Sequence, residues 1–472
     1  MSRFIATFAA VKPYEPFIMM RKLLLSAVLA LVSSTAVQAG GLMTNTNYHI
    51  AFDRMFARGA TSEIDATFSN PAGLAWGREG FQLSLNFQKP WQRRDIELNN
   101  TTYEGVASAP IVPALFAAYK KDRIALSAMI GIVGSGGFVK YDQGVPQYNV
   151  MVQSLMGGII PQLNQLPGIN IPTNYALNSE MKGKQYIYGG QLNFTYKLLD
   201  CLSAAVGVRI NYYDGYYRGH VIADAQNEYG QLAKLLLDVD QKGWGFTPLV
   251  SINYHQGPLT LSARYEFRTK LNPENSTNVL DAGLGNGLVA KVAAVPVYGE
   301  ATLMKIREAL APQMAAATAP FQDGACTRYD MPALLAVAAG YEFTPKLRAA
   351  LEYHFFDDKN AKMANDRQKE LTHGTHEILA GVEYDINEKF TVSCGGQRTD
   401  YGLSDGYQQD TSFACDSYSL GLGGAWNINE KVRLNVSYFC SLYSDYNKQA
   451  VFGQETYSRT NHVIGLGLDY KF

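Results

Sequence analysis

The sequence predicts an all-β protein, a transmembrane antiparallel β-barrel of about fourteen strands, from three observations. Apolar and polar residues alternate along many segments, as in 259–267 and 347–355. The connections between these segments alternate between short and long. The last segment alternates in the same way and ends in the aromatic residue Phe472. A soluble sandwich also shows alternation, but it has no reason to sort its loops.

The order of the loops sets the expected orientation. Short turns are predicted at 120–122, 199–200, 256–258, 344–346, 387–388 and 429–430. Long connections are predicted near 92–110, 138–183, 225–240, 271–325, 358–374, 402–411 and 447–455. The strands between them are expected to have about 10 to 15 residues, enough to cross a bilayer when tilted. Short periplasmic turns and long outer loops are typical of bacterial outer-membrane barrels, so we expect a multi-pass protein of a Gram-negative outer membrane.

The N-terminal part reads as a targeting segment. Arg21 and Lys22 precede an apolar run at 23–32, and a small-residue cleavage site ends at Ala39. The apolar run is short for a membrane anchor, which needs roughly 20 residues. We therefore expect an over-extended start plus a cleaved signal peptide at 1–39, an N-terminal hatch (a plug inside the lumen) at 40–78, and a barrel at 79–472.

The composition limits the partners. Gly 43 and Tyr 30 suit β structure with an aromatic membrane interface, and a net charge of −1 argues against nucleic acid. The five cysteines show no metal-binding spacing, and their odd number leaves at least one unpaired, with one disulfide possible. We expect no cofactor and no metal.

The segment 40–78 is too apolar for a free periplasmic tail, because Phe52, Phe56, Phe68 and Trp76 favour burial. Its first part, 48–58, is compatible with a helix. The stretch 66–76 is expected to be neither helix nor strand, because Pro71 lacks a backbone donor and its neighbours form turns. A lumen of about fourteen strands leaves a channel unless something fills it, so this segment is expected inside the barrel.

Two long connections carry helical patterns of apolar residues. The first, 229–238, contains Leu232, Leu235 and Leu236, and the second, 302–317, contains Leu303, Ile306 and Leu310. These helices either cap the barrel mouth or form a ligand groove at the cell surface.

The third strand is expected at 123–133, followed by a glycine-rich run at 134–137. Glycines permit bulges and kinks in a strand, so Gly134, Gly136 and Gly137 are candidates for a kink. The alternative is a flexible start to the following long loop.

Four arginines are predicted to face the lumen: Arg264, Arg268, Arg348 and Arg433. They either bind a ligand carboxylate or pair with the acidic residues Glu266, Glu352 and Asp469.

Catalytic motifs are weak. His373 and His376 form the only close histidine pair, and a metal role would need a third ligand. No G-x-S-x-G is present, and the glycine run 421–424 lies in a predicted strand without a following helix. The sequence therefore predicts a protein that is not an enzyme.

The residues 56–60 and 66–74, which include Asn70, Pro71, Ala72 and Gly73, resemble the N-terminal hatch of the FadL-type long-chain fatty-acid transporters. The resemblance implies passive uptake of fatty acids or other hydrophobic molecules. Ligand would bind between the third and fourth outer loops, pass the Asn-Pro-Ala gate and leave sideways through a kink in strand three. We also expect a monomer surrounded by outer-membrane lipid, and the C-terminal strand that ends in Phe472 resembles the signal read by the barrel assembly machinery. The alternatives are a general porin and an outer-membrane lipid-modifying enzyme.

Overall fold

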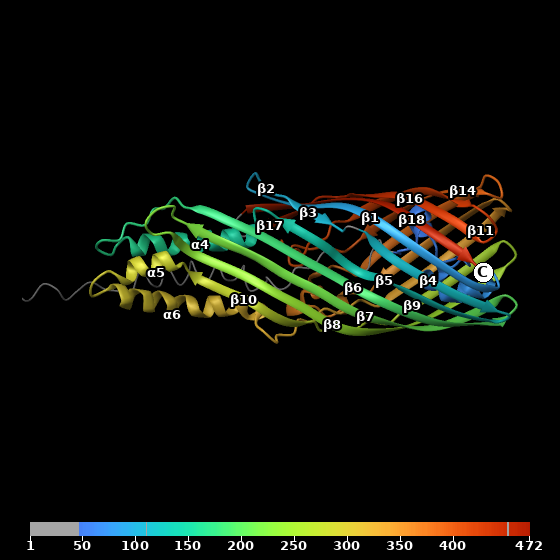
Figure 1. Ribbon diagram of the computed structural model, residues 1–472, viewed down its shortest axis with the longest axis horizontal. Helices are drawn as coiled ribbons and strands as arrows, with labels where there is room; N and C mark the ends of the chain where they lie inside the picture. Colours follow the sequence, from blue (N-terminus) through green and yellow to red (C-terminus); the bar gives the residue numbers. More distant parts are fainter. Residues whose placement is uncertain (1–46, 110, 451–452) are drawn as a thin grey trace, which may run out of the picture.

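The computed structural model describes residues 47–109, 111–450 and 453–472. The chain forms one elongated barrel, with its three longest helices gathered at the end opposite the C-terminus (Figure 1). The expected signal peptide and the first residues of the expected hatch lie outside the described residues.

The strands are β1 (Gly80–Leu98), β2 (Thr101–Tyr103), β3 (Gly105–Ser108), β4 (Val112–Lys121), β5 (Ile124–Tyr141), β6 (Ala176–Leu199), β7 (Leu202–Asp224), β8 (Gln231–Gln256), β9 (Leu259–Glu266), β10 (Glu274–Leu284), β11 (Leu334–Thr344), β12 (Leu347–Phe356), β13 (Thr375–Asp385), β14 (Phe390–Asp400), β15 (Ser417–Asn427), β16 (Val432–Tyr443), β17 (Tyr446–Ala450) and β18 (Gly453–Lys471). The α-helices are α2 (Ile50–Met55), α3 (Ala66–Ser69), α4 (Pro146–Leu163), α5 (Asn286–Ala293) and α6 (Gly299–Thr318). The 3₁₀ helices are η1 (Pro71–Trp76), η2 (Ala319–Phe321), η3 (Asp358–Asn360) and η4 (Ala364–Glu370).

The barrel is closed and antiparallel, because β1 pairs with β18 over its length. Three crossings of the barrel wall consist of more than one strand. The strands β2, β3 and β4 together make one crossing, β9 and β10 make a second, and β16 and β17 make a third. The strands therefore make fourteen passes, which confirms the predicted fold class. The predicted short turns lie at one end of the barrel, beside the C-terminus (Figure 1).

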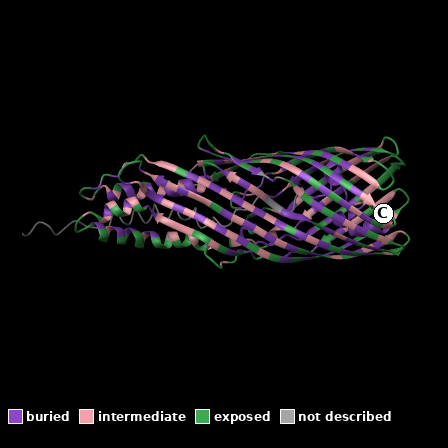
Figure 2. Ribbon diagram, viewed as in Figure 1, coloured by how far each residue is buried: buried purple, intermediate pink, exposed green. Residues whose placement is uncertain are grey.

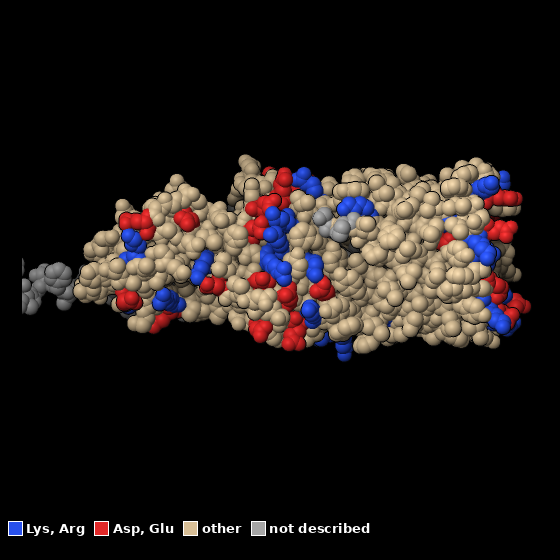
Figure 3. Space-filling model, viewed as in Figure 1, with Lys and Arg blue, Asp and Glu red and all other residues tan. Residues whose placement is uncertain are grey.

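The apolar residues of the alternating strands face outward from the barrel, and the polar residues face the lumen. Along β15, for example, Tyr418, Leu420 and Leu422 are more than half exposed, whereas Ser417 and Ser419 are buried inside. Exposed and buried residues alternate along the strands (Figure 2). On the face that Figure 3 shows, the half of the barrel nearer the C-terminus carries a band with few charges, and charged residues lie at both edges of this band. This is the surface expected of a barrel in lipid.

None of the helices in the described part of the chain is both long and apolar enough to cross a bilayer.

One prediction about the outer loops and one about the length of the strands were wrong. The segment 229–238 is not helical, because most of it belongs to β8, which pairs with β7 on one side and β10 on the other. The third outer loop is therefore a tight hairpin. β6, β7 and β8 have 24, 23 and 26 residues, well beyond the expected strand length. Their outer halves extend beyond the apolar band and support the helices (Figures 1 and 3).

The second and fourth outer loops contain helices. The predicted helix at 302–317 lies within α6, and α5 precedes it. The loop 138–183 contains α4, which the sequence reasoning missed.

The expectation for 66–76 was also wrong, because this stretch is helical. It forms α3 and then η1, with Pro71 in the first turn of η1, where a missing backbone donor has no cost. The expected helix at 48–58 is confirmed as α2.

Candidate functional site

Residues 47–78, which we call the hatch below, pack against inward-facing side chains of the barrel wall. The hatch helix α2 rests on glycines of neighbouring strands. A Cβ placed on Gly381 of β13 or Gly395 of β14 would lie 2.0 Å from the carbonyl oxygen of Met55, and one on Gly421 of β15 would lie 2.2 Å from that of Asp53. Only residues without a side chain permit this approach. These three glycines form a cradle for α2, which the sequence reasoning did not identify.

The predicted gate residues are anchored by wall side chains. The Asn70 amide donates to Asn253 Oδ1 (2.9 Å), and the Ala72 backbone N–H donates to Ser251 Oγ (3.1 Å). Two wall hydroxyls donate in turn to hatch carbonyls, Thr195 to Pro71 and Ser203 to Ala72, at 2.8 and 2.6 Å. The Asn-Pro-Ala motif is therefore fixed to β6, β7 and β8 in this structure.

A close approach also restricts Gly73, the fourth predicted gate residue. A Cβ there would lie 2.2 Å from the Thr61 carbonyl oxygen. Gly73 thus allows the two halves of the hatch to pack together.

Buried ions join the hatch to the wall. The Arg54 guanidinium pairs with Glu383 of β13, and both side chains are fully buried. Arg58 pairs with Asp65 (2.6 Å) within the hatch. Asp53 accepts hydrogen bonds from the neutral Gln88 and Ser437, and burial raises its pKa well above 3.8. Such pairs favour one arrangement of the hatch.

Above the hatch, toward the outer end, the lumen holds a second charged cluster. Arg209 binds Glu266 through two hydrogen bonds of 2.9 and 2.8 Å, and Arg264 lies 3.2 Å from the same carboxylate. His354 contacts Glu352 (2.7 Å) and Glu377 (2.9 Å).

This cluster holds hatch backbone as well. Arg264 donates to the Phe68 carbonyl, and the Gly59 N–H donates to Glu352 (2.7 Å). A cavity of about 30 Å³ lies between the cluster and the hatch.

The predicted arginines are all paired. Arg264 pairs with Glu266 as expected, whereas Arg348 pairs with Glu383 and Asp385. Arg433 pairs with Glu63 of the hatch and Arg268 with Asp330. The other two acidic residues that were predicted to pair with these arginines contact histidines instead. Glu352 binds His354, and Asp469 lies 3.4 Å from His49.

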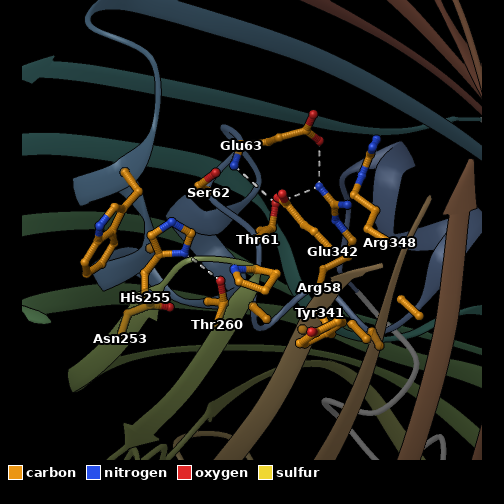
Figure 4. Close-up of a pocket in the computed structure, with 18 of the residues that line it drawn as sticks. Arg58, Thr61, Ser62, Glu63, Asn253, His255, Thr260, Tyr341, Glu342 and Arg348 are labelled. Atoms are coloured by element: carbon orange, nitrogen blue, oxygen red, sulfur yellow. Dashed lines mark hydrogen bonds and ion pairs between the residues drawn. The ribbon is translucent and has the colours of Figure 1, made fainter. Parts of the chain in front are cut away.

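A larger cavity of about 250 Å³ lies on the other side of the hatch, toward the short turns. Arg58, Thr61 and Glu63 of the hatch face it, together with His255 and Arg348 of the wall (Figure 4). Arg58 donates to Thr61 Oγ1 (2.8 Å) and to Glu63 (2.7 Å), so its charge is already balanced.

The wall is interrupted at the predicted kink. β5 pairs with β4 as far as Gly131 opposite Ala114, and with β3 again from Phe138 opposite Ser108. Among the described residues, 132–137 of β5 have no ladder partner on this side. On the other side, toward β6, the register shifts at Val133 and at Gly136. The predicted kink residues therefore belong to a doubly bulged strand, not to a flexible loop.

An apolar cluster connects the hatch to this interruption. Val133 is buried, and a Cβ on Gly189 of β6 would lie 2.4 Å from its Cγ1. Buried apolar residues of the hatch and of the interrupted wall form one cluster: Tyr48, Ile64, Phe68, Leu74, Phe116, Met129, Ile132, Val133 and Ile187. The hatch thus presents apolar side chains to the place where wall pairing stops.

At the outer end, most of the predicted groove residues are buried in a packed cap. Leu232, Leu303, Ile306 and Leu310 are at most 4% exposed, and Leu235 is 9% exposed. They pack in one cluster with apolar residues of α4, including Val152, Met156, Ile159, Ile160 and Leu163. Leu236 lies on the opposite face of β8 and outside this cluster. The helices therefore cap the mouth, and these residues line no open groove in this structure.

The cap is held by a buried acidic pair. Asp410, in the loop between β14 and β15, accepts the Gln147 N–H at the start of α4 (2.6 Å). The Tyr457 hydroxyl lies 2.8 Å from Asp410 and 2.8 Å from Glu455, and Lys448 lies 3.7 Å from Glu455. Burial, and then the neighbouring Glu455, raise the pKa of Asp410 from 3.8 to about 7.

Closure of the cap is expected to weaken as pH rises. Because the pKa of Asp410 is higher in the closed cap, closure is strongest below about pH 4 and is progressively lost as the pH rises to about 7. Over this range the equilibrium constant for closure falls by up to about tenfold per pH unit. Hydrogen exchange of the backbone amides in α4 measures how often the cap opens. The intrinsic exchange rate of an amide also changes with pH, so the unmodified protein is compared with Asp410→Asn at each pH. Equal exchange in both proteins between about pH 5 and pH 8 would contradict this mechanism.

Other predicted features have no assembled site. His376 contacts the Tyr353 hydroxyl (2.7 Å), and its ring lies 5.1 Å from that of His373. Within the described ranges no group of three metal-binding side chains comes together. All five cysteines are free thiols. The glycine run 421–424 lies in β15.

Comparison with known proteins supports the fold. Residues 312–472 match the family model of the outer membrane protein beta-barrel domain. A Pseudomonas aeruginosa FadL homologue is similar in structure, with a TM-score of 0.62 and 14% identity over 92% of this chain and 100% of that one. The Pseudomonas putida toluene transporter TodX has a TM-score of 0.56 and 12% identity over 93% and 99% of the two chains. The Ralstonia pickettii toluene transporter TbuX has a TM-score of 0.50 and 14% identity over 87% and 94%.

No curated protein sequence matches the chain. The structural likenesses confirm the resemblance to FadL-type barrels at the level of the fold. Together with the family model they indicate a multi-pass barrel of the Gram-negative outer membrane.

Proposed function

We propose that the protein is a channel, and not an enzyme, through which hydrophobic small molecules diffuse passively across the outer membrane. The observation that carries this proposal is the interrupted wall at β3 to β5, joined to the hatch by an apolar cluster. The structurally similar proteins are a FadL homologue and two toluene transporters, which supports a hydrophobic cargo.

The route follows from the energetics of apolar solutes. A hydrocarbon chain loses about 0.8 kcal/mol per methylene when it returns to water. A sideways exit through the interruption delivers the molecule directly into lipid and avoids this loss. The hatch is bonded to β6, β7, β8, β12 and β13, which argues against a general porin. Movement of the hatch about the Asn70–Gly73 segment would open the path from the cap to the interruption.

The remaining partners follow from this placement. We propose that the barrel acts as a monomer in outer-membrane lipid, and the closure of the sheet within one chain supports this. Phe472 directly follows the closing strand β18, and its exposed ring lies 5.1 Å from that of Phe81. It is the expected recognition point for the barrel assembly machinery.

The bulges of β5 provide the test. Deletion of both Val133 and Gly136 makes β5 regular along β6 and is expected to abolish most uptake of radiolabelled palmitate and toluene by cells. Deletion of Asn278, which lies at the bulge between Thr277 and Val279 of β10, is the matched control and should leave uptake unchanged. The uptake is compared only between cells that contain equal amounts of each folded variant and of the unmodified protein in the outer membrane. Normal uptake without the β5 bulges would exclude the lateral route.

A further inference from the structure

A groove of about 680 Å³ lies on the outward face of the barrel wall, over β4, β5, β6 and β7. Its surface is almost entirely apolar, and Tyr119 of β4 and Phe194 of β6 line it near the short turns. The volume is within the range of about 300–1,000 Å³ that is typical of sites for small molecules. The proposed uptake does not use this groove, because the groove lies outside the lumen.

The groove forms where two small residues meet on neighbouring strands. Ala117 of β4 is paired with Ala128 of β5, and both are half-buried although they face outward. The next outward pair toward the short turns, Tyr119 and Leu126, is 45% and 52% exposed. Leu192 of β6 lies opposite Ala128 and is 62% exposed. The alanines therefore form the floor of the groove, and the larger side chains form its rims.

The groove opens toward lipid. Figure 1 places β4 and β5 in the half of the barrel nearer the C-terminus, which carries the band with few charges in Figure 3. Inside a membrane there is no water to exclude, so binding depends on van der Waals contact between matching surfaces. A flexible hydrocarbon chain can touch the floor and both rims at once. The acyl chains of membrane lipids surround the wall at this depth and are the expected occupants.

Two cations lie at the end of the groove nearer the short turns. Lys121 is on the same outward face as Tyr119, two residues further along β4, and Arg123 follows in the turn to β5. Lys121 is exposed and makes no ion pair with any residue in the described ranges, and neither cation pairs with Asp122 between them. Arg123 lies 3.5 Å from Asp200, whose side chain is 94% exposed, and such an open pair contributes little. Both cations are therefore available to an anionic group at the membrane surface.

We propose that this groove binds a phospholipid of the leaflet on the side of the short turns, which is the periplasmic leaflet. One acyl chain lies between the rims, and the phosphate is held by Lys121 and Arg123 through charge-assisted hydrogen bonds. The site takes a molecule of the membrane and not the cargo, so it goes beyond the proposed function. The bound lipid packs against β5 beside the interrupted wall, because Ala128 is three residues before Gly131, where the pairing of β5 with β4 ends.

The test compares two lipids that share their acyl chains, dipalmitoyl phosphatidylglycerol and dipalmitoylglycerol, which lacks the phosphate. Their binding to the purified full-length protein is measured by native mass spectrometry. Ala128→Phe fills the floor of the groove and is expected to abolish binding of both lipids there. The double variant Lys121→Gln with Arg123→Gln should weaken binding of phosphatidylglycerol alone, by about fivefold for each cation removed.

Two substitutions on other parts of the wall are the matched controls. Ala380→Phe changes an exposed alanine of β13, and Lys431→Gln changes an exposed lysine in the short turn between β15 and β16. Neither should alter the affinity for either lipid, and an equal loss in these controls would overturn the site by showing unspecific attachment. Unchanged binding after Ala128→Phe would also overturn it.

The same spectra distinguish the other occupants. Displacement of phosphatidylglycerol from the unmodified protein by palmitate would assign the groove to the cargo. A lipid-free dimer that Ala128→Phe dissociates would assign it to a second copy of the chain. Either result would overturn the proposed lipid site and leave the uptake of hydrophobic molecules to be judged by the bulge deletions in β5.

Discussion

Substituting valine for Gly395 is expected to dislodge the hatch and make the outer membrane leaky to polar solutes. The first atom of a side chain there would lie 2.0 Å from the Met55 carbonyl oxygen and 2.5 Å from its carbonyl carbon. Overpacking costs about 1–3 kcal/mol even where side chains can move aside, and here the obstacle is the backbone of α2. The helix must therefore leave the cradle, which removes the contact between the hatch and β13 to β15. Entry of a polar dye into liposomes that contain the purified protein measures the leak.

The neighbouring Gly396→Val is the matched control. A Cβ at Gly396 meets no atom closer than 3.6 Å and points away from the hatch. Both variants place the same β-branched residue in the same strand, so they share any effect on strand propensity. An equal leak from the two variants would show that the damage lies in the wall and not in the hatch.

The sequence predicted the wall because membrane strands record their surroundings directly. Each outward residue faces lipid and each inward residue faces the lumen, so the alternation, the turn order and the closing strand at Phe472 are local patterns. The hatch was predicted for the same reason, since its apolar residues require burial. The exact conformation of 66–76 was missed, because Pro71 and Gly73 are as compatible with a helical turn as with an irregular one.

The errors arose where pairing is not local. Leu232, Leu235 and Leu236 fit a helical face, but β7 and β10 supply hydrogen bonds on both sides of this segment and make it a strand. The cradle was missed because Gly381 and Gly395 are opposite each other only in the folded register. The groove on the outer wall was missed likewise, because Ala128 and Leu192 come together only when β5 pairs with β6.

Glu383→Gln is expected to weaken docking of the hatch by about 3–5 kcal/mol, the usual cost of leaving one buried charge without its partner. Arg54 has no exposed surface and would keep only neutral acceptors, the hydroxyl of Ser393 (2.7 Å) and the amide oxygen of the new glutamine. Limited proteolysis of the hatch measures docking. The control is Asp385→Asn, because Asp385 also pairs with Arg348 but is 28% exposed and bonds to no hatch residue.

The double variant Arg54→Met with Glu383→Gln separates an ion-pair effect from a general loss of packing. Because it removes both charges together, no buried charge of this pair remains uncompensated, and protease resistance should return toward that of the unmodified protein. If the double variant is as sensitive as Glu383→Gln alone, Glu383 supports the hatch chiefly through Arg348 and the wall. Recovery in the double variant would instead identify the Arg54–Glu383 pair as the lock between hatch and barrel, which any ligand-driven movement of the hatch must break.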